Sequence, residues 1–171
     1  MSRAWPAALQ ARRPELLLAL VIVVLDQLTK AAVRGRFVLH ETAEVVPGFL
    51  NLTRVHNSGA AFGMLNTVEF PFKPLLLTLV ALLALGGIGW YTVSIPLGDR
   101  LARLGIAAVA GGAIGNVIDR ATAGYVLDFV DAYWRGWHFW AFNVADAAIT
   151  LGVGLMILDL LGLGRRASHP A

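Results

Sequence analysis

The stretch FNVADAAITLGVGLMIL, residues 142–158, is apolar along almost its whole length and contains one ionisable side chain, Asp146. It has the character of a membrane-spanning helix, because crossing a hydrocarbon core of about 30 Å takes about 20 helical residues. A carboxylate at the centre of such a helix costs about 2.5–3.5 kcal/mol on insertion scales. Asp146 is therefore a functional hypothesis, and it needs a partner.

The rest of the chain has the same membrane character. Its 171 residues are 57% hydrophobic and 15% charged, which lies outside the composition of ordinary soluble domains. The sequence predicts an all-α membrane protein, a single domain over residues 1–171, with four transmembrane helices at 14–33, 70–91, 101–119 and 142–163. The longer connections, 34–69 and 120–141, are expected on one side of the membrane and both termini on the other.

Charge and cysteine content exclude several classes of function. The chain has no cysteine, which excludes disulfides, thiolate catalysis and cysteine metal sites. Its net charge is only +3 and its basic residues are scattered, so no nucleic-acid partner is expected. Lys and Arg are equally numerous on the two sides, and only the paired arginines near both termini favour a cytoplasmic location for these ends.

The two longer connections carry strand and interface signals. VVPGFLNLTRVHN (45–57) has β-branched, alternating residues around Pro-Gly and predicts a short strand pair at the membrane surface, and GYVLDFV (124–130) is also strand-like. The aromatic run YWRGWHFWAF (133–142) is typical of a segment at the lipid headgroups. The predicted fold is thus four helices with a small β-containing surface segment.

Polar residues gather at the ends of the spans that meet these connections. Asp26 and Lys30 are four residues apart, which predicts an ion pair on one helical face. Asp119 is followed by Arg120 as a counter-charge and suits a structural hydrogen-bond network with Asn116. Gly111 and Gly115 form a small-xxx-small pair that permits close helix packing.

Asp128 has apolar neighbours in VLDFV and no Lys or Arg within five residues. Such surroundings raise a carboxyl pKa, and a second carboxylate nearby separates the two into an acid and a base. Asp128 is therefore the best candidate partner for Asp146, whereas Asp131 is expected to be solvated. Two such acids can activate water for peptide hydrolysis without a metal or another cofactor.

The residues alone leave two other uses of these acids open. Oxygen ligands suit Mg²⁺ or Ca²⁺, so a metal-dependent transferase could use Asp119, Asp128, Asp131 and Asp146. Intramembrane acids also serve proton relays, so a small transporter or proton-coupled channel is the alternative from another class.

Five stretches together resemble a known family. They are DQLTK (26–30), NSGAAFG (57–63), GGAIGNVIDR (111–120), GYVLDFVD (124–131) and FNVADAAI (142–149). In this order and among four apolar spans, they resemble the bacterial lipoprotein signal peptidases, the signal peptidase II family, across nearly the whole chain.

The resemblance implies an aspartic endopeptidase of the bacterial inner membrane that removes the signal peptide from prolipoproteins, cutting before a Cys that carries a diacylglyceryl group. It implies cytoplasmic termini, a site facing the periplasm, contact with membrane lipids and inhibition by globomycin-type peptides. Carried over by motif, Asp128 and Asp146 are the catalytic pair, with Asp26 and Lys30 beneath them. The residues expected to line or brace the site are Asn57, Gly59, Ala61, Phe62, Gly112, Asn116, Asp119, Arg120, Asn143 and Ala145.

Overall fold

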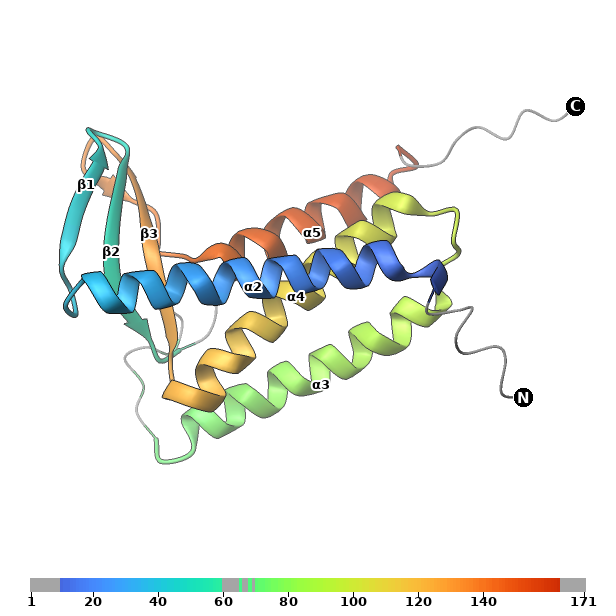
Figure 1. Ribbon diagram of the computed structural model, residues 1–171, viewed down its shortest axis with the longest axis horizontal. Coiled ribbons are helices and arrows are strands. Elements are labelled where there is room, and N and C mark those ends of the chain that lie inside the picture. The colour runs from blue at the N-terminus through green and yellow to red at the C-terminus, as the bar shows by residue number, and fades with distance from the viewer. Residues whose placement is uncertain (1–9, 60–64, 66–67, 69, 164–171) are drawn as a thin grey trace, which may run out of the picture.

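The computed structural model describes residues 10–59, 65, 68 and 70–163. Within this part the chain forms four long helices and a small antiparallel sheet (Figure 1). The helices are α2 (Arg13–Arg36), α3 (Lys73–Ser94), α4 (Arg100–Ala123) and α5 (Val144–Leu160). The strands are β1 (Thr42–Val46), β2 (Leu50–Asn57), β3 (Val126–Trp134) and β4 (Trp137–His138).

The four predicted helices are present, with shifted bounds. In the described residues, three of them (α2, α3 and α4) are long and apolar enough to cross a membrane. The fourth, α5, has 17 residues and ends at Leu160, three residues before the predicted end. It begins at Val144 because Asn143 caps it, accepting a hydrogen bond from the backbone N–H of Asp146 while the Asp146 side chain accepts one from the backbone of Asn143.

Helix α4 lies at the centre of the helix bundle, in contact with each of the other three helices (Figure 1). The backbones of α2 and α5 approach that of α4 closely because glycines line the faces of α4 that contact them. A Cβ on Gly111 would lie 2.9 Å from the carbonyl oxygen of Ala19 in α2, and one on Gly105 would lie 2.6 Å from that of Gly152 in α5. The predicted small-residue packing is therefore present, and it includes α5 as well as α2.

The outer faces of the helices are apolar and exposed. Large side chains along α2 and α3, among them Leu17, Leu28, Leu83 and Trp90, are at least half exposed. Lipid tails suit such a surface, whereas water does not. The exposed leucines thus agree with a membrane protein, in which the buried interior is small and the outside is apolar.

The sheet has the strand order β1-β2-β3-β4 and lies at one end of the helix bundle (Figure 1). The predicted strand pair of residues 45–57 is confirmed, but its first strand begins earlier, at Thr42; the turn uses Gly48 with a positive φ of 80°. Strand β3 extends into the aromatic run and pairs there with β4, which periodicity did not predict because β4 has only two residues. Val55 of β2 pairs with Asp128 of β3, so the sheet brings β2 to the predicted site.

Candidate active site

Asn143 joins the two carboxylates that the sequence singles out. Its side-chain amide donates a 2.7 Å hydrogen bond to Oδ1 of Asp128, and its backbone N–H donates a 3.2 Å bond to Oδ2 of Asp146. Asp128 comes from β3 and Asp146 from the first turn of α5, so the tertiary fold brings these acids to one residue. The Asn143 side chain is fully buried, which holds the arrangement in place.

Each carboxylate also accepts a hydrogen bond from a second asparagine. Asn57, at the end of β2, donates to Oδ2 of Asp128 at 3.0 Å. Asn116 of α4 donates to Oδ1 of Asp146 at 2.8 Å. Neutral amides can orient a carboxylate without adding a fixed positive charge, so either acid can gain or lose a proton during a reaction.

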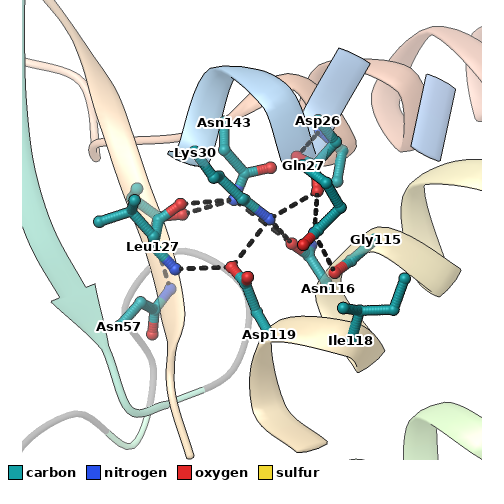
Figure 2. Close-up of polar contacts among 12 residues, drawn as sticks. Asp26, Gln27, Lys30, Asn57, Gly115, Asn116, Ile118, Asp119, Leu127 and Asn143 are labelled. Atoms are coloured by element: carbon teal, nitrogen blue, oxygen red, sulfur yellow. Dashed lines mark hydrogen bonds and ion pairs between the residues drawn. The ribbon is translucent and has the colours of Figure 1, made fainter. Parts of the chain in front are cut away.

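A buried ionic network lies directly beneath this pair. Lys30 of α2 contacts Oδ2 of Asp26 at 2.8 Å, Oδ2 of Asp119 at 3.0 Å and Oδ1 of Asn116 at 3.0 Å (Figure 2). Lys30, Asp26 and Asp119 are fully buried. The predicted pairing of Asp26 with Lys30 is confirmed, and Lys30 orients the asparagine that holds Asp146.

Asp119 makes its close ion pairs with Lys30 and Arg34 of α2. Its Oδ1 lies 2.7 Å from Arg34 and its Oδ2 accepts a 3.0 Å hydrogen bond from the backbone N–H of Leu127. Arg120 instead donates to the carbonyl oxygen of Gly59 at 3.2 Å. The charge of Arg120 still acts on Asp119, as the sequence predicted, and it acts on Asp146 and Asp128 as well.

Backbone contacts fix the first turn of α5. The N–H of Ala145 donates to Oδ1 of Asp26 at 3.0 Å. Gly112 of α4 packs so closely on the carbonyl of Ala145 that a Cβ could not fit there. Asp26 and Gly112 therefore hold the first turn of the helix that carries Asp146 against α2 and α4.

The surroundings of Asp128 change its protonation. Burial raises the pKa of Asp128 from its ordinary value of 3.8 to about 7, and the negative charge of Asp146 acts in the same direction. Hydrogen bonds from Asn57 and Asn143 lower the pKa in part. A carboxyl with a pKa near neutrality can hold or release a proton at working pH, as a general acid must.

Some contributors to the site were not predicted. Gln27 donates to Oδ2 of Asp26 at 3.0 Å and to the carbonyl of Gly115 at 3.2 Å. Arg34 holds Asp119, and its spacing was a usable signal, because Asp26, Lys30 and Arg34 recur every four residues on one helical face. Two predicted residues, Ala61 and Phe62, lie outside the described part of the chain.

The other acids do not gather around a metal site in the described residues. No three His, Asp or Glu side chains there are placed to hold an ion. Asp131 was expected to be solvated, but its side chain is only 14% exposed. It lies 2.9 Å from Nδ1 of His138 and accepts a 2.9 Å hydrogen bond from Asn51. β4 places His138 beside it.

Comparisons with known proteins agree with this architecture. The lipoprotein signal peptidase of Symbiobacterium thermophilum is 44% identical over 153 residues, covering 90% of this chain and 97% of that protein. The lipoprotein signal peptidase of Maridesulfovibrio salexigens is 46% identical over 143 residues, covering 84% and 92%. A solved bacterial membrane enzyme at 2.3 Å resolution superposes with a TM-score of 0.80 at 30% identity, covering 92% of this chain and 93% of that one.

The family model described as signal peptidase (SPase) II matches residues 18–162, from α2 to the end of α5. This range includes Asp26, Lys30, Asp128 and Asp146, together with the asparagines that contact them. The chain belongs to the signal peptidase II family.

Proposed function

We propose that Asp128 and Asp146 are the catalytic pair with which this enzyme hydrolyses the peptide bond before the diacylglyceryl-modified Cys of prolipoproteins. As a member of the signal peptidase II family, the chain is an aspartic protease that removes signal peptides from prolipoproteins. The observation that carries the catalytic assignment is the shared contact of both carboxylates with Asn143.

In the proposed reaction, Asp146 is the ionised base and Asp128 carries the proton. Asp146 removes a proton from a water molecule, and the water oxygen attacks the scissile carbonyl carbon. Asp128 donates its proton to the carbonyl oxygen, giving a neutral tetrahedral intermediate. The proton on Asp146 then passes to the leaving amine as the C–N bond breaks, and Asp128 takes back a hydroxyl proton from the intermediate, which gives the carboxylic acid product and restores the starting protonation of both acids. The raised pKa of Asp128 supports this assignment of roles.

The proposal also includes the membrane arrangement. All four helices span the bacterial inner membrane as parts of one integral domain over residues 1–171, with α5 as the shortest span. Both termini are cytoplasmic, and the sheet and the carboxylate pair face the periplasm. The lipid chains of the substrate stay among membrane lipids, and globomycin-type peptides compete with the substrate for the site at Asp128 and Asp146.

Asp128→Asn and Asp146→Asn test the catalytic assignment. Each variant is expected to lose at least about 10³-fold in cleavage rate, because an amide can neither remove nor donate the proton. The measurement is a gel-shift assay on a diacylglyceryl-modified prolipoprotein, with and without globomycin. Turnover within tenfold of wild type in either variant removes that residue from the mechanism.

Asp119→Asn is the matched comparison, because it changes an equally buried carboxylate that is held by Lys30 and Arg34. Its expected effect is a lower unfolding temperature, with cleavage retained in the protein that remains folded. A well-folded Asp119→Asn protein with no turnover would reopen the choice of catalytic residues.

A further inference from the structure

A cavity of about 420 Å³ lies at the end of the helix bundle opposite Asp128 and Asp146. Residues near the ends of α3 and α5 and at the start of α4 line it. These helix ends lie together at the end of the bundle away from the sheet (Figure 1). Its walls combine apolar and polar side chains: Tyr91, Ser94, Asp99, Val153, Met156 and Asp159. Two carboxylates in a partly apolar cavity fit a ligand that is cationic and joined to an apolar chain.

Asp159 is the residue in this cavity that the fold leaves unexplained. It is 8% exposed, and its buried Oδ1 has no hydrogen-bond partner among the described residues. The nearby arginines bind elsewhere: Arg12 donates to the carbonyl of Ile95 at 3.0 Å, and Arg103 donates to that of Leu97 at 2.6 Å and pairs with Glu15. A buried carboxylate oxygen without a partner is unfavourable, so a cationic ligand at this place would stabilise it.

Two helices lead from the carboxylate pair to this cavity. Asp159 follows Asp146 by 13 residues on α5, which is about 20 Å along a helix. Helix α3 begins at Lys73, whose Nζ lies 3.2 Å from Oγ of Ser58, next to Asn57, and it ends at the cavity with Ser94. In the described residues, α3 and α5 each pack on α4 but make few contacts with each other.

Signal peptides have a length and charge pattern that match this arrangement. A basic n-region precedes an apolar stretch of about 7–15 residues, and the cleavage site follows. As a helix, that apolar stretch is about 10–22 Å long. A substrate cut at Asp128 and Asp146 would therefore bring its basic residues close to Asp159.

We propose that this cavity binds the basic n-region of the substrate's signal peptide, with Asp159 and Asp99 as the recognition acids. The inference rests on the proposed function and adds a second point of recognition about 20 Å from the reacting bond. Such a site improves binding of the substrate and leaves the chemical step unchanged, so it acts on KM and not on kcat.

The test uses two diacylglyceryl-modified prolipoproteins that differ only in the n-region, one with its native Lys and Arg residues and one with Gln in their place. Wild-type enzyme is expected to show a KM about five- to tenfold lower for the basic substrate, with equal kcat. Asp159→Asn should raise the KM of the basic substrate to that of the neutral one. The kinetics of the neutral substrate should not change, which also shows that the variant is folded.

Glu15→Gln is the matched control, because Glu15 is a buried acid at the same end of the bundle that pairs with Arg103 and does not line the cavity. It should keep the preference for the basic substrate. If wild type cleaves both substrates with equal KM, this inference fails while the proposed function stands. If wild type cleaves neither, the proposed function itself fails.

Two other cations could occupy the cavity, and either result would overturn the inference. One is the amine of a lipid headgroup: wild type would then show equal KM for the two substrates, and phosphatidylethanolamine in the detergent would raise the unfolding temperature of wild type and not that of Asp159→Asn. The other is the chain's own Arg165 or Arg166: wild type would then show equal KM for the two substrates, and a protein ending at residue 163 would unfold at a lower temperature than wild type does.

Discussion

At the scale of single residues, Asn143 does more than its place in the sequence suggests. It caps α5, contacts Asp146 through its backbone and holds Asp128 through its side chain. Its spacing of three residues from Asp146 predicted a supporting role. Its contact with Asp128 depends on how β3 packs beside α5, which no local pattern contains.

The protonation of Asp128 predicts how stability depends on pH. Because the pKa of Asp128 is raised to about 7, the folded protein keeps this proton between pH about 4 and about 7, where the unfolded chain has lost it. The contribution of Asp128 to stability is therefore fully present below pH about 4 and is lost as the pH rises through about 7. Asp128→Asn cannot ionise and should lack this part of the pH dependence.

Thermal unfolding in detergent at several pH values measures this difference between wild type and Asp128→Asn. The cleavage rate of wild type should also fall above pH about 7, about tenfold per pH unit at the high end, as the acid loses its proton. Parallel stability curves for the two proteins would show that Asp128 is not the titrating group.

At the scale of the elements, the close contact of α4 with α5 determines where Asp146 lies. Gly112 packs on the Ala145 carbonyl, and Gly105 and Gly152 face each other about two turns further along. The sequence predicted the small-residue face of α4 from Gly111 and Gly115. Its contact with α5 was not predicted, because a pattern on one helix does not say which neighbour fills it.

Gly112→Ala tests this contact. The added methyl group would clash with backbone atoms of Ala145 and lie 2.8 Å from Cγ1 of Ile149, so the helices must move apart. We expect the free energy of unfolding to fall by about 1–3 kcal/mol, and cleavage to fall as well because Asp146 moves with Ala145. Unfolding in detergent and the gel-shift assay measure the two effects.

Gly154→Ala is the control on α5, since a Cβ there meets nothing within 4 Å. It should leave cleavage unchanged and raise stability by up to about 1 kcal/mol through helix propensity. Equal changes in unfolding free energy and cleavage rate in the Gly112→Ala and Gly154→Ala variants would contradict a close contact between α4 and α5.

At the scale of the whole molecule, the polar groups are unevenly distributed along the bundle. The sheet, both carboxylates and the Lys30 network lie at one end, and the cavity with Asp159 lies at the other. A proton pathway would need polar groups across the full thickness of the bilayer. The distribution therefore favours a reaction at one membrane surface. It agrees with membership of a peptidase family and argues against the transporter alternative.

This distribution predicts activity without an ion gradient or an added metal. In detergent, where no gradient exists, the purified enzyme should cleave its substrate, and EDTA should change the rate by less than about twofold, since water activation by two carboxylates needs no Lewis acid. The gel-shift assay measures both. Loss of cleavage in EDTA that Mg²⁺ restores would instead favour the metal-dependent alternative.

The sequence alone determined the four helices and the main strands, and it singled out the acids that we propose for catalysis, because these depend on local features: apolar length, alternation, and a carboxylate that has no local partner. The tertiary structure decided the partners. Asp119 contacts Lys30 and Arg34 instead of the adjacent Arg120, and Asp128 and Asp146 meet at Asn143. These contacts join residues that are distant in the chain, and their geometry depends on how closely the helices and the sheet pack.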